Sequence, residues 1–134
     1  MNTDWYEDVL DFHRTMGSPI GEKPHIPPRD IKKLRTDLIG EEVGEALDAL
    51  WSGDLEKLAD GLADSIVVLL GTAIACGIDL RPIWDEVHKT NMAKEGGPKA
   101  ENGKQLKPEG WQPPKIKELL EKQKDARVHT HIRG

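Results

Sequence analysis

The feature that most restricts the fold is a pair of long helical patterns joined by a very short connection. In residues 30–52, apolar side chains recur three and four positions apart, as on one face of a helix. In residues 54–76, they cover more than one side, which is typical of a central helix. Gly53 suits the end of the first helix and Asp54 the cap of the second. Two antiparallel helices that face each other are therefore expected.

Shorter patterns flank this pair. Asp30 and Asp79 are expected to cap helices, and Gly77 to end one in a left-handed conformation. The further elements expected are two helices, a glycine- and proline-rich arm and a short terminal helix, at residues 4–16, 79–92, 96–114 and 115–124. The predicted fold class is all-α, a four-helix bundle with an irregular C-terminal arm. We expect a single domain over residues 1–125 and a flexible tail over residues 126–134.

Composition narrows the class of protein. The chain has 134 residues, a net charge of −5 and only six aromatic side chains, so neither a β-sandwich nor a nucleic-acid-binding protein is expected. The single cysteine, Cys76, excludes an intramolecular disulfide and fits a reducing cytoplasm. The longest apolar stretch, residues 65–78, contains glycine and is too short to span a bilayer. We therefore expect a soluble, cytoplasmic protein without a membrane partner.

Acidic side chains cluster on the two facing helices. Glu42 and Glu45 lie three positions apart, and Glu41 lies four before Glu45, so the three project near one face. Asp60 and Asp64 are also four apart, within an unusually apolar helix. A solvated acidic face would explain the glutamates alone, but unpaired carboxylates in an apolar helix are costly. A hard divalent cation such as Mg²⁺, which prefers oxygen ligands, resolves this cost.

The order of these motifs resembles that of the MazG-like all-α nucleotide pyrophosphohydrolases, whose signature is ExxE on one helix and ExxD on the next. The resemblance is carried by residues 38–45, 59–64, 71–73, 77–79, 85–94 and 107–114. One departure concerns the metal ligands: the signature glutamate three positions before Asp64 is replaced by Gly61. Asp60, one position earlier and still able to share a face with Asp64, is expected to take its role.

The resemblance implies hydrolysis of a (deoxy)nucleoside triphosphate to the monophosphate and pyrophosphate, with Mg²⁺ as cofactor and Mn²⁺ as a substitute. A deoxynucleotide is preferred, with dGTP, dUTP and dCTP all open, as is attack at the α- or β-phosphorus. Glu42, Glu45 and Asp64 are assigned as core metal ligands, completed by Asp60. Glu41 binds a further metal ion or orients the attacking water as general base.

Five residues are candidates for binding the substrate. By resemblance, Asn91 and Lys94 contact phosphates, although Lys94 would also suit a helix C-terminus without any ligand. Lys107 in the arm is a weaker candidate. Arg35 either reaches the site or forms a structural ion pair, and His13 either contacts the base or is a satisfied core or surface histidine. The family commonly builds its site between protomers, so a homodimer or homotetramer is expected.

Two other functions remain as alternatives. A carboxylate-bridged di-iron bundle also uses acids on facing helices, but it requires two Glu-x-x-His motifs. The chain has only Asp85-x-x-His88, away from the acidic clusters. A non-catalytic helical interaction module would tolerate neutral replacement of the acidic face with no effect beyond stability.

Overall fold

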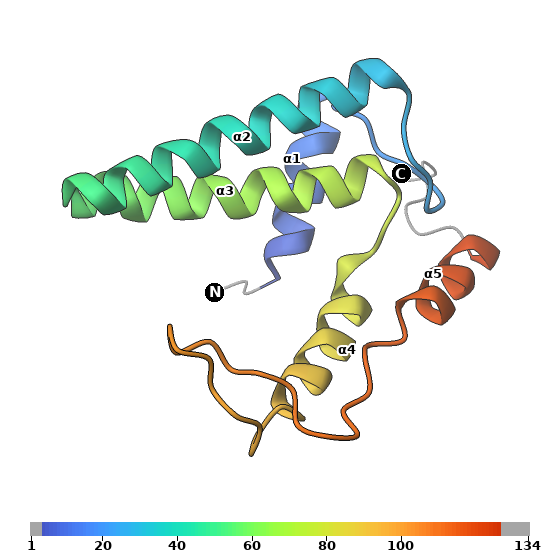
Figure 1. The fold of residues 1–134 in the computed structure, drawn as a ribbon. Coiled ribbons are helices and arrows are strands. Elements are labelled where there is room, and N and C mark those ends of the chain that lie inside the picture. Colours follow the sequence, from blue (N-terminus) through green and yellow to red (C-terminus); the bar gives the residue numbers. More distant parts are fainter. Residues whose placement is uncertain (1–3, 127–134) are drawn as a thin grey trace.

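A computed structural model of the chain describes residues 4–126 and is all-α, as predicted (Figure 1). Its helices are, in order, α1 (Trp5–Met16), α2 (Arg29–Ser52), α3 (Leu55–Ala75), α4 (Leu80–Met92) and α5 (Ile116–Asp125). Among the described residues the only extended pairing is an isolated bridge between Lys99 and Gln105. The predicted tail, except residue 126, lies outside the described residues.

Local chemistry accounts for most helix ends. Asp54 and Asp79 cap α3 and α4 through their side chains, as predicted. Gly53 ends α2 with a φ of 78°, the left-handed conformation that glycine adopts without strain. The prediction for Asp30 was wrong: the cap position is Pro28, two residues earlier, α2 begins at Arg29, and no side chain caps it. A proline is tolerated here because the first N–H groups of a helix have no partner within the helix, so the missing N–H costs no helical hydrogen bond. Its fixed φ also restricts the chain where the helix starts.

The α2–α3 pair forms the frame of the molecule. The two helices lie side by side along their length, and α1 crosses them (Figure 1). Gly61 allows close packing in the half of the pair nearer the α2–α3 turn, since a Cβ atom built there would lie 3.0 Å from Cα of Ala46. The core lies where α1 meets the second half of α3 and consists of Tyr6, Val9, Leu10, Ala73 and Ile74. The first half of α3 therefore lies beyond the core of this chain.

Helix α4 leaves the frame and extends away from it with the arm and α5 (Figure 1). Its main partner is α5. Gln123 of α5 ties the two together, because its side chain accepts from the Asp79 backbone N–H at 3.0 Å and donates to the Asp79 carbonyl at 2.9 Å. The arrangement thus differs from a compact bundle: three helices pack together and the fourth is placed apart with the arm.

The apolar surface of α2 and α3 is only partly covered. Leu50, Leu55 and Leu62 are 57%, 78% and 52% exposed, and Trp51 is 89% exposed. By length and composition alone α3 could cross a membrane, a test that the core helix of a soluble protein also passes.

An ion-pair cluster joins the start of α1 to the start of α4. Arg81 donates to both carboxylate oxygens of Asp79, at 2.9 and 3.0 Å, and to Asp4 at 2.9 Å. Its guanidinium also lies 4.7 Å from the ring centroid of Tyr6. A backbone hydrogen bond from Glu7 and the contact with Arg81 hold the pKa of Asp4 below its ordinary value of 3.8.

We expect Arg81→Gln to lower the melting temperature by about 3 °C, a small effect because the cluster is half-exposed. A lowered carboxyl pKa contributes stability that is present above the unfolded value and is lost as pH falls through the folded value. The loss on acidification should therefore be shallower in Arg81→Gln than in the unaltered protein. Melting temperatures from pH 7 down to pH 2.5 test this, and parallel curves would contradict it.

Candidate functional site

The acidic side chains lie along one edge of the α2–α3 pair. Ala46 is a position of α2 that faces α3. Viewed along the axis of α2, Glu41 and Glu45 are rotated to one side of Ala46. Gly61 is a position of α3 that faces α2. Viewed along the axis of α3 from the same chain direction, Asp60 and Asp64 are rotated to the same side of Gly61. Because the two helices are antiparallel and face each other, rotation in the same direction about each axis brings the glutamates of α2 and the aspartates of α3 to the same edge of the pair. The opposite rotation places Leu47, Leu50, Leu62, Ile66 and Leu69 on the other edge.

Glu42 is the most perturbed carboxylate of this acidic edge. Its Oε2 atom is buried and has no hydrogen-bond partner among the described residues. Burial raises the pKa of Glu42, and the neighbouring charges of Glu45, Asp64, Glu41 and Asp60 raise it further, in that order. Carboxylates from both helices therefore act electrostatically on one buried oxygen.

A groove of about 570 Å³ opens beside this cluster, towards the α2–α3 turn. Glu45 and Asp60 line it together with Asp48, Asp54 and Lys57. Asp48 lies three positions after Glu45 and was not among the metal ligands assigned from the sequence. The same three- and four-residue spacing places it in the groove, so the signal was present in the sequence.

The donor set fits a hard divalent cation. Carboxylate oxygens are the ligands that Mg²⁺ prefers, and a buried, unpartnered carboxylate oxygen is an atom that a cation would satisfy. Within residues 4–126, no three acidic, histidine or cysteine side chains converge into a ready-made metal cage. The acidic edge thus offers oxygen ligands from two helices, and a Mg²⁺ ion bound there would need water or other ligands to complete its shell.

Arg35 and His13 lie away from this edge, where α1 crosses α2 and α3. Arg35 is 8% exposed and donates to the Thr72 hydroxyl at 3.1 Å and to the Val68 carbonyl at 2.9 Å. His13 is 2% exposed, and its Nδ1 lies 3.0 Å from the carbonyl oxygen of Pro19. Both side chains border Gly71, where a Cβ atom would lie within 3 Å of each. In the described residues Arg35 has no carboxylate within 4.0 Å, so the ion pair considered from the sequence is not found.

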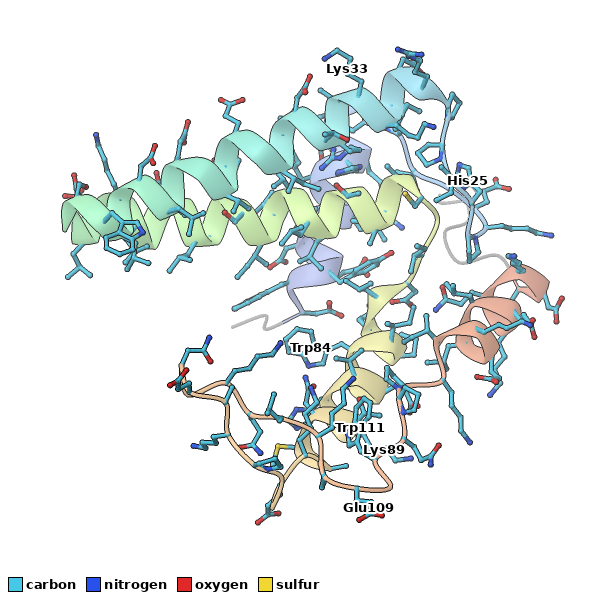
Figure 2. All side chains as sticks on the ribbon, in the orientation of Figure 1. His25, Lys33, Trp84, Lys89, Glu109 and Trp111 are labelled. Atoms are coloured by element: carbon cyan, nitrogen blue, oxygen red, sulfur yellow. The ribbon has the colours of Figure 1, made fainter. Side chains whose placement is uncertain are left out.

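The other substrate-binding candidates gather around the end of α4. Asn91 is exposed in the last turn of this helix, and Lys94 follows it. The ammonium groups of Lys94 and Lys107 lie 5.4 and 4.6 Å from the ring centroid of Trp111. Figure 2 shows Trp111 beside this end of α4. The structure thus unites two lysines that are thirteen positions apart in the sequence.

Trp111 also belongs to this group, although it was not among the substrate-binding candidates named from the sequence. The indole Nε1 donates to the carbonyl of Thr90 at 2.7 Å and so fixes the arm to α4. An aromatic residue in an arm that contains several lysines was the available signal. The lysine pair and the acidic edge belong to the two parts of the chain that Figure 1 shows apart.

The chain was compared with known proteins. The family model described as phosphoribosyl-ATP pyrophosphohydrolase matches residues 9–91, which include α2, α3 and the acidic edge. An uncharacterised protein of Acanthamoeba polyphaga mimivirus is 37% identical over 79 residues, covering 56% of this chain and 32% of the viral protein. The chain thus spans about a third of the length of this curated relative.

The matched family lies within the MazG-like nucleotide pyrophosphohydrolase superfamily, which confirms the resemblance at that level. Its match over most of the chain shows that this protein belongs to the phosphoribosyl-ATP pyrophosphohydrolase family.

Proposed function

We propose that the chain hydrolyses a (deoxy)nucleoside triphosphate to the monophosphate and pyrophosphate in a Mg²⁺-dependent reaction. The observation that carries the proposal is the buried, unpartnered Oε2 atom of Glu42 among four other carboxylates. The family match supports the same reaction class. A deoxynucleotide is the preferred substrate, and Mn²⁺ substitutes for Mg²⁺.

Each carboxylate of the acidic edge has a role. Glu42, Glu45 and Asp64 hold the metal, and Asp60 completes the set. Bound Mg²⁺ supplies neutralisation of the phosphate charge and orientation of the reacting groups. Glu41, which is exposed, orients the attacking water and accepts its proton. The water oxygen forms a new bond to the α- or β-phosphorus, the bond from that phosphorus to the α–β bridging oxygen breaks, and the monophosphate and pyrophosphate separate.

The phosphate tail needs cations in addition to the metal. Lys94 and Lys107 supply them, and Asn91 adds an amide from the same end of α4. Arg35 and His13 stay predictions from the sequence alone. Their buried contacts with Gly71 and the backbone suit them to fix the helix crossing instead.

We further propose that the working unit is a homodimer or homotetramer. The apolar edge of α2 and α3, defined by Leu47, Leu50, Leu62, Ile66 and Leu69, is too exposed for a typical monomer surface. A second copy would cover this apolar edge and leave the acidic edge, on the other side of the pair, open to the arm of a further copy. Because lysines and carboxylates lie on separate parts of one chain, the site would then be shared between copies.

A single charge should test this assembly. Leu50→Lys places an ammonium group in the apolar edge and is expected to shift the protein to monomers in sedimentation velocity, because its burial would be costly. Ile26→Lys is the matched control, since Ile26 is equally apolar and 77% exposed but lies in the loop before α2. If the unaltered protein already sediments as a monomer, or if both variants behave alike, the assembly proposal fails.

The reaction is tested by measuring pyrophosphate and monophosphate release from all common NTPs and dNTPs, with Mg²⁺, with Mn²⁺ and with EDTA. Phosphoribosyl-ATP belongs in the panel because the matched family carries its name. We expect release that EDTA abolishes and that is fastest for a deoxynucleotide. Release from phosphoribosyl-ATP alone would replace the proposed substrate, and no release from any nucleotide would favour the non-catalytic interaction module.

A further inference from the structure

The arm that follows α4 is folded tightly against the end of that helix. The side-chain amide of Gln105 donates to the carbonyls of Gly97 at 2.8 Å and of Lys94 at 3.2 Å. A Cβ atom at Gly97 would overlap the carbonyl oxygen of Leu106, so these two parts of the arm approach closely. Trp111 closes the arm onto α4 through its bond to the Thr90 carbonyl. A segment with the composition of a loop therefore holds fixed side-chain positions.

The electrostatics of the arm oppose those of the whole protein. Residues 94–115 contain five lysines and three glutamates, whereas the chain carries a net charge of −5. In the described residues, neither Lys94 nor Lys107 has a carboxylate oxygen within 4.0 Å. Both ammonium groups are instead attracted to the electron-rich ring of Trp111. One indole thus contacts two ammonium groups, and a polyanion that reached both would offset their positive charges.

We propose that Trp111 is a positioning residue that presents Lys94 and Lys107 as a cradle for a polyphosphate. The inference rests on the proposed function in that the polyphosphate is the tail of its nucleotide substrate. Trp111 acts through the two lysines. Its ring fixes the positions of their ammonium groups, and its N–H holds the ring against α4. The chemistry recognised is a chain of phosphates, and the nucleoside does not contribute to it.

The first experiment measures binding without catalysis. Replacing Trp5, Trp51 and Trp84 by phenylalanine leaves Trp111 as the only fluorescent indole, and all three replaced side chains are more than half exposed. Figure 2 shows Trp84 on the side of α4 that faces away from α5. Titration with inorganic triphosphate in EDTA should give a saturable change in fluorescence that weakens with added salt. If the triple variant does not fold, calorimetry on the unaltered full chain gives the dissociation constant for triphosphate instead.

A matched pair of charge changes makes this test specific. Lys107→Gln should raise the dissociation constant for triphosphate by about tenfold, as expected for loss of one charge-assisted contact. Lys99→Gln removes the same charge from the same arm, away from the ring, and should have less than a twofold effect. No saturable binding, or equal effects of the two changes, would overturn the proposal.

The second experiment separates positioning from a structural role. Trp111→Leu should raise KM for the nucleotide by about tenfold and change kcat less than twofold, whereas Trp111→Phe keeps a ring and should lie between. A fall in kcat and melting temperature with unchanged KM would show a purely structural role and overturn the proposal. Because triphosphate binding needs no hydrolysis, a protein that binds it but cleaves no nucleotide would refute only the proposed function. A protein that cleaves nucleotides but ignores Lys107→Gln and Trp111→Leu would refute only this inference.

Discussion

Glu42→Gln is expected to reduce Mg²⁺-dependent nucleotide hydrolysis by at least about a hundredfold while leaving the helix content unchanged. The amide keeps the size of the side chain but removes the negative charge that a metal ion requires. The same change should raise the melting temperature of the metal-free protein. Burial and four neighbouring carboxylates disfavour the charged form of Glu42, and a neutral amide ends this repulsion.

This prediction is selective because the same change, Glu42→Gln, is expected to lower activity and to raise stability. Circular dichroism and melting in EDTA measure the stability, and pyrophosphate release measures the activity. Glu56→Gln is the control, since Glu56 is an exposed glutamate in the first turn of α3 and lies outside the cluster. Full turnover in Glu42→Gln would show that the metal-site assignment is wrong, and so would an activity loss of equal size in Glu56→Gln.

Mixing two impaired variants at substrate concentrations well below KM tests whether the site is shared. Neither Glu42→Gln nor Lys107→Gln, whose weaker phosphate binding lowers turnover under these conditions, contains all the proposed groups in one chain. If the carboxylates of one copy work with the lysines of another, the mixture should regain about a quarter of the normal sites, as in a random pairing of subunits. No gain over the separate variants would place the complete site within one chain.

Gly77→Ala is expected to destabilise the fold by roughly 3 kcal/mol or more. Gly77 has a φ of +69°, and a Cβ atom there would overlap the carbonyl of Lys23. The loop before α2 is bound to the end of α3 at this point, by hydrogen bonds of 2.9 Å from Gly21 to Ile74 and from His25 to Cys76. Alanine would therefore add backbone strain and also push the loop away. Denaturant unfolding measures the loss.

Gly17→Ala separates the two contributions. Gly17 also has a φ of +69°, but a Cβ atom there would meet nothing within 4 Å. We expect about 1 kcal/mol of destabilisation, the cost of the left-handed conformation alone. Equal losses in both variants would mean that the contact between the loop and α3 contributes nothing.

Helix positions and charge stripes were predictable from the sequence. Periodicity and caps located α3 between Asp54 and Gly77, because both signals depend on residues a few positions apart. Spacing also predicted that Glu42 and Glu45 share a face of α2. Asp30 shows the limit of such signals: a good capping residue lies two positions after Pro28, which already occupies the cap position of the helix.

Contacts between distant segments needed the tertiary structure. The burial of Arg35 against Thr72 and Val68 depends on the crossing of three helices, and the pairing of Lys94 with Lys107 depends on how the arm folds back onto Trp111. The sequence by itself determined which faces of the helices are acidic and which are apolar, because a helix repeats every few residues. Only the tertiary structure decided which faces meet within the chain and which stay exposed, because helix crossing depends on close packing between residues that are far apart in sequence.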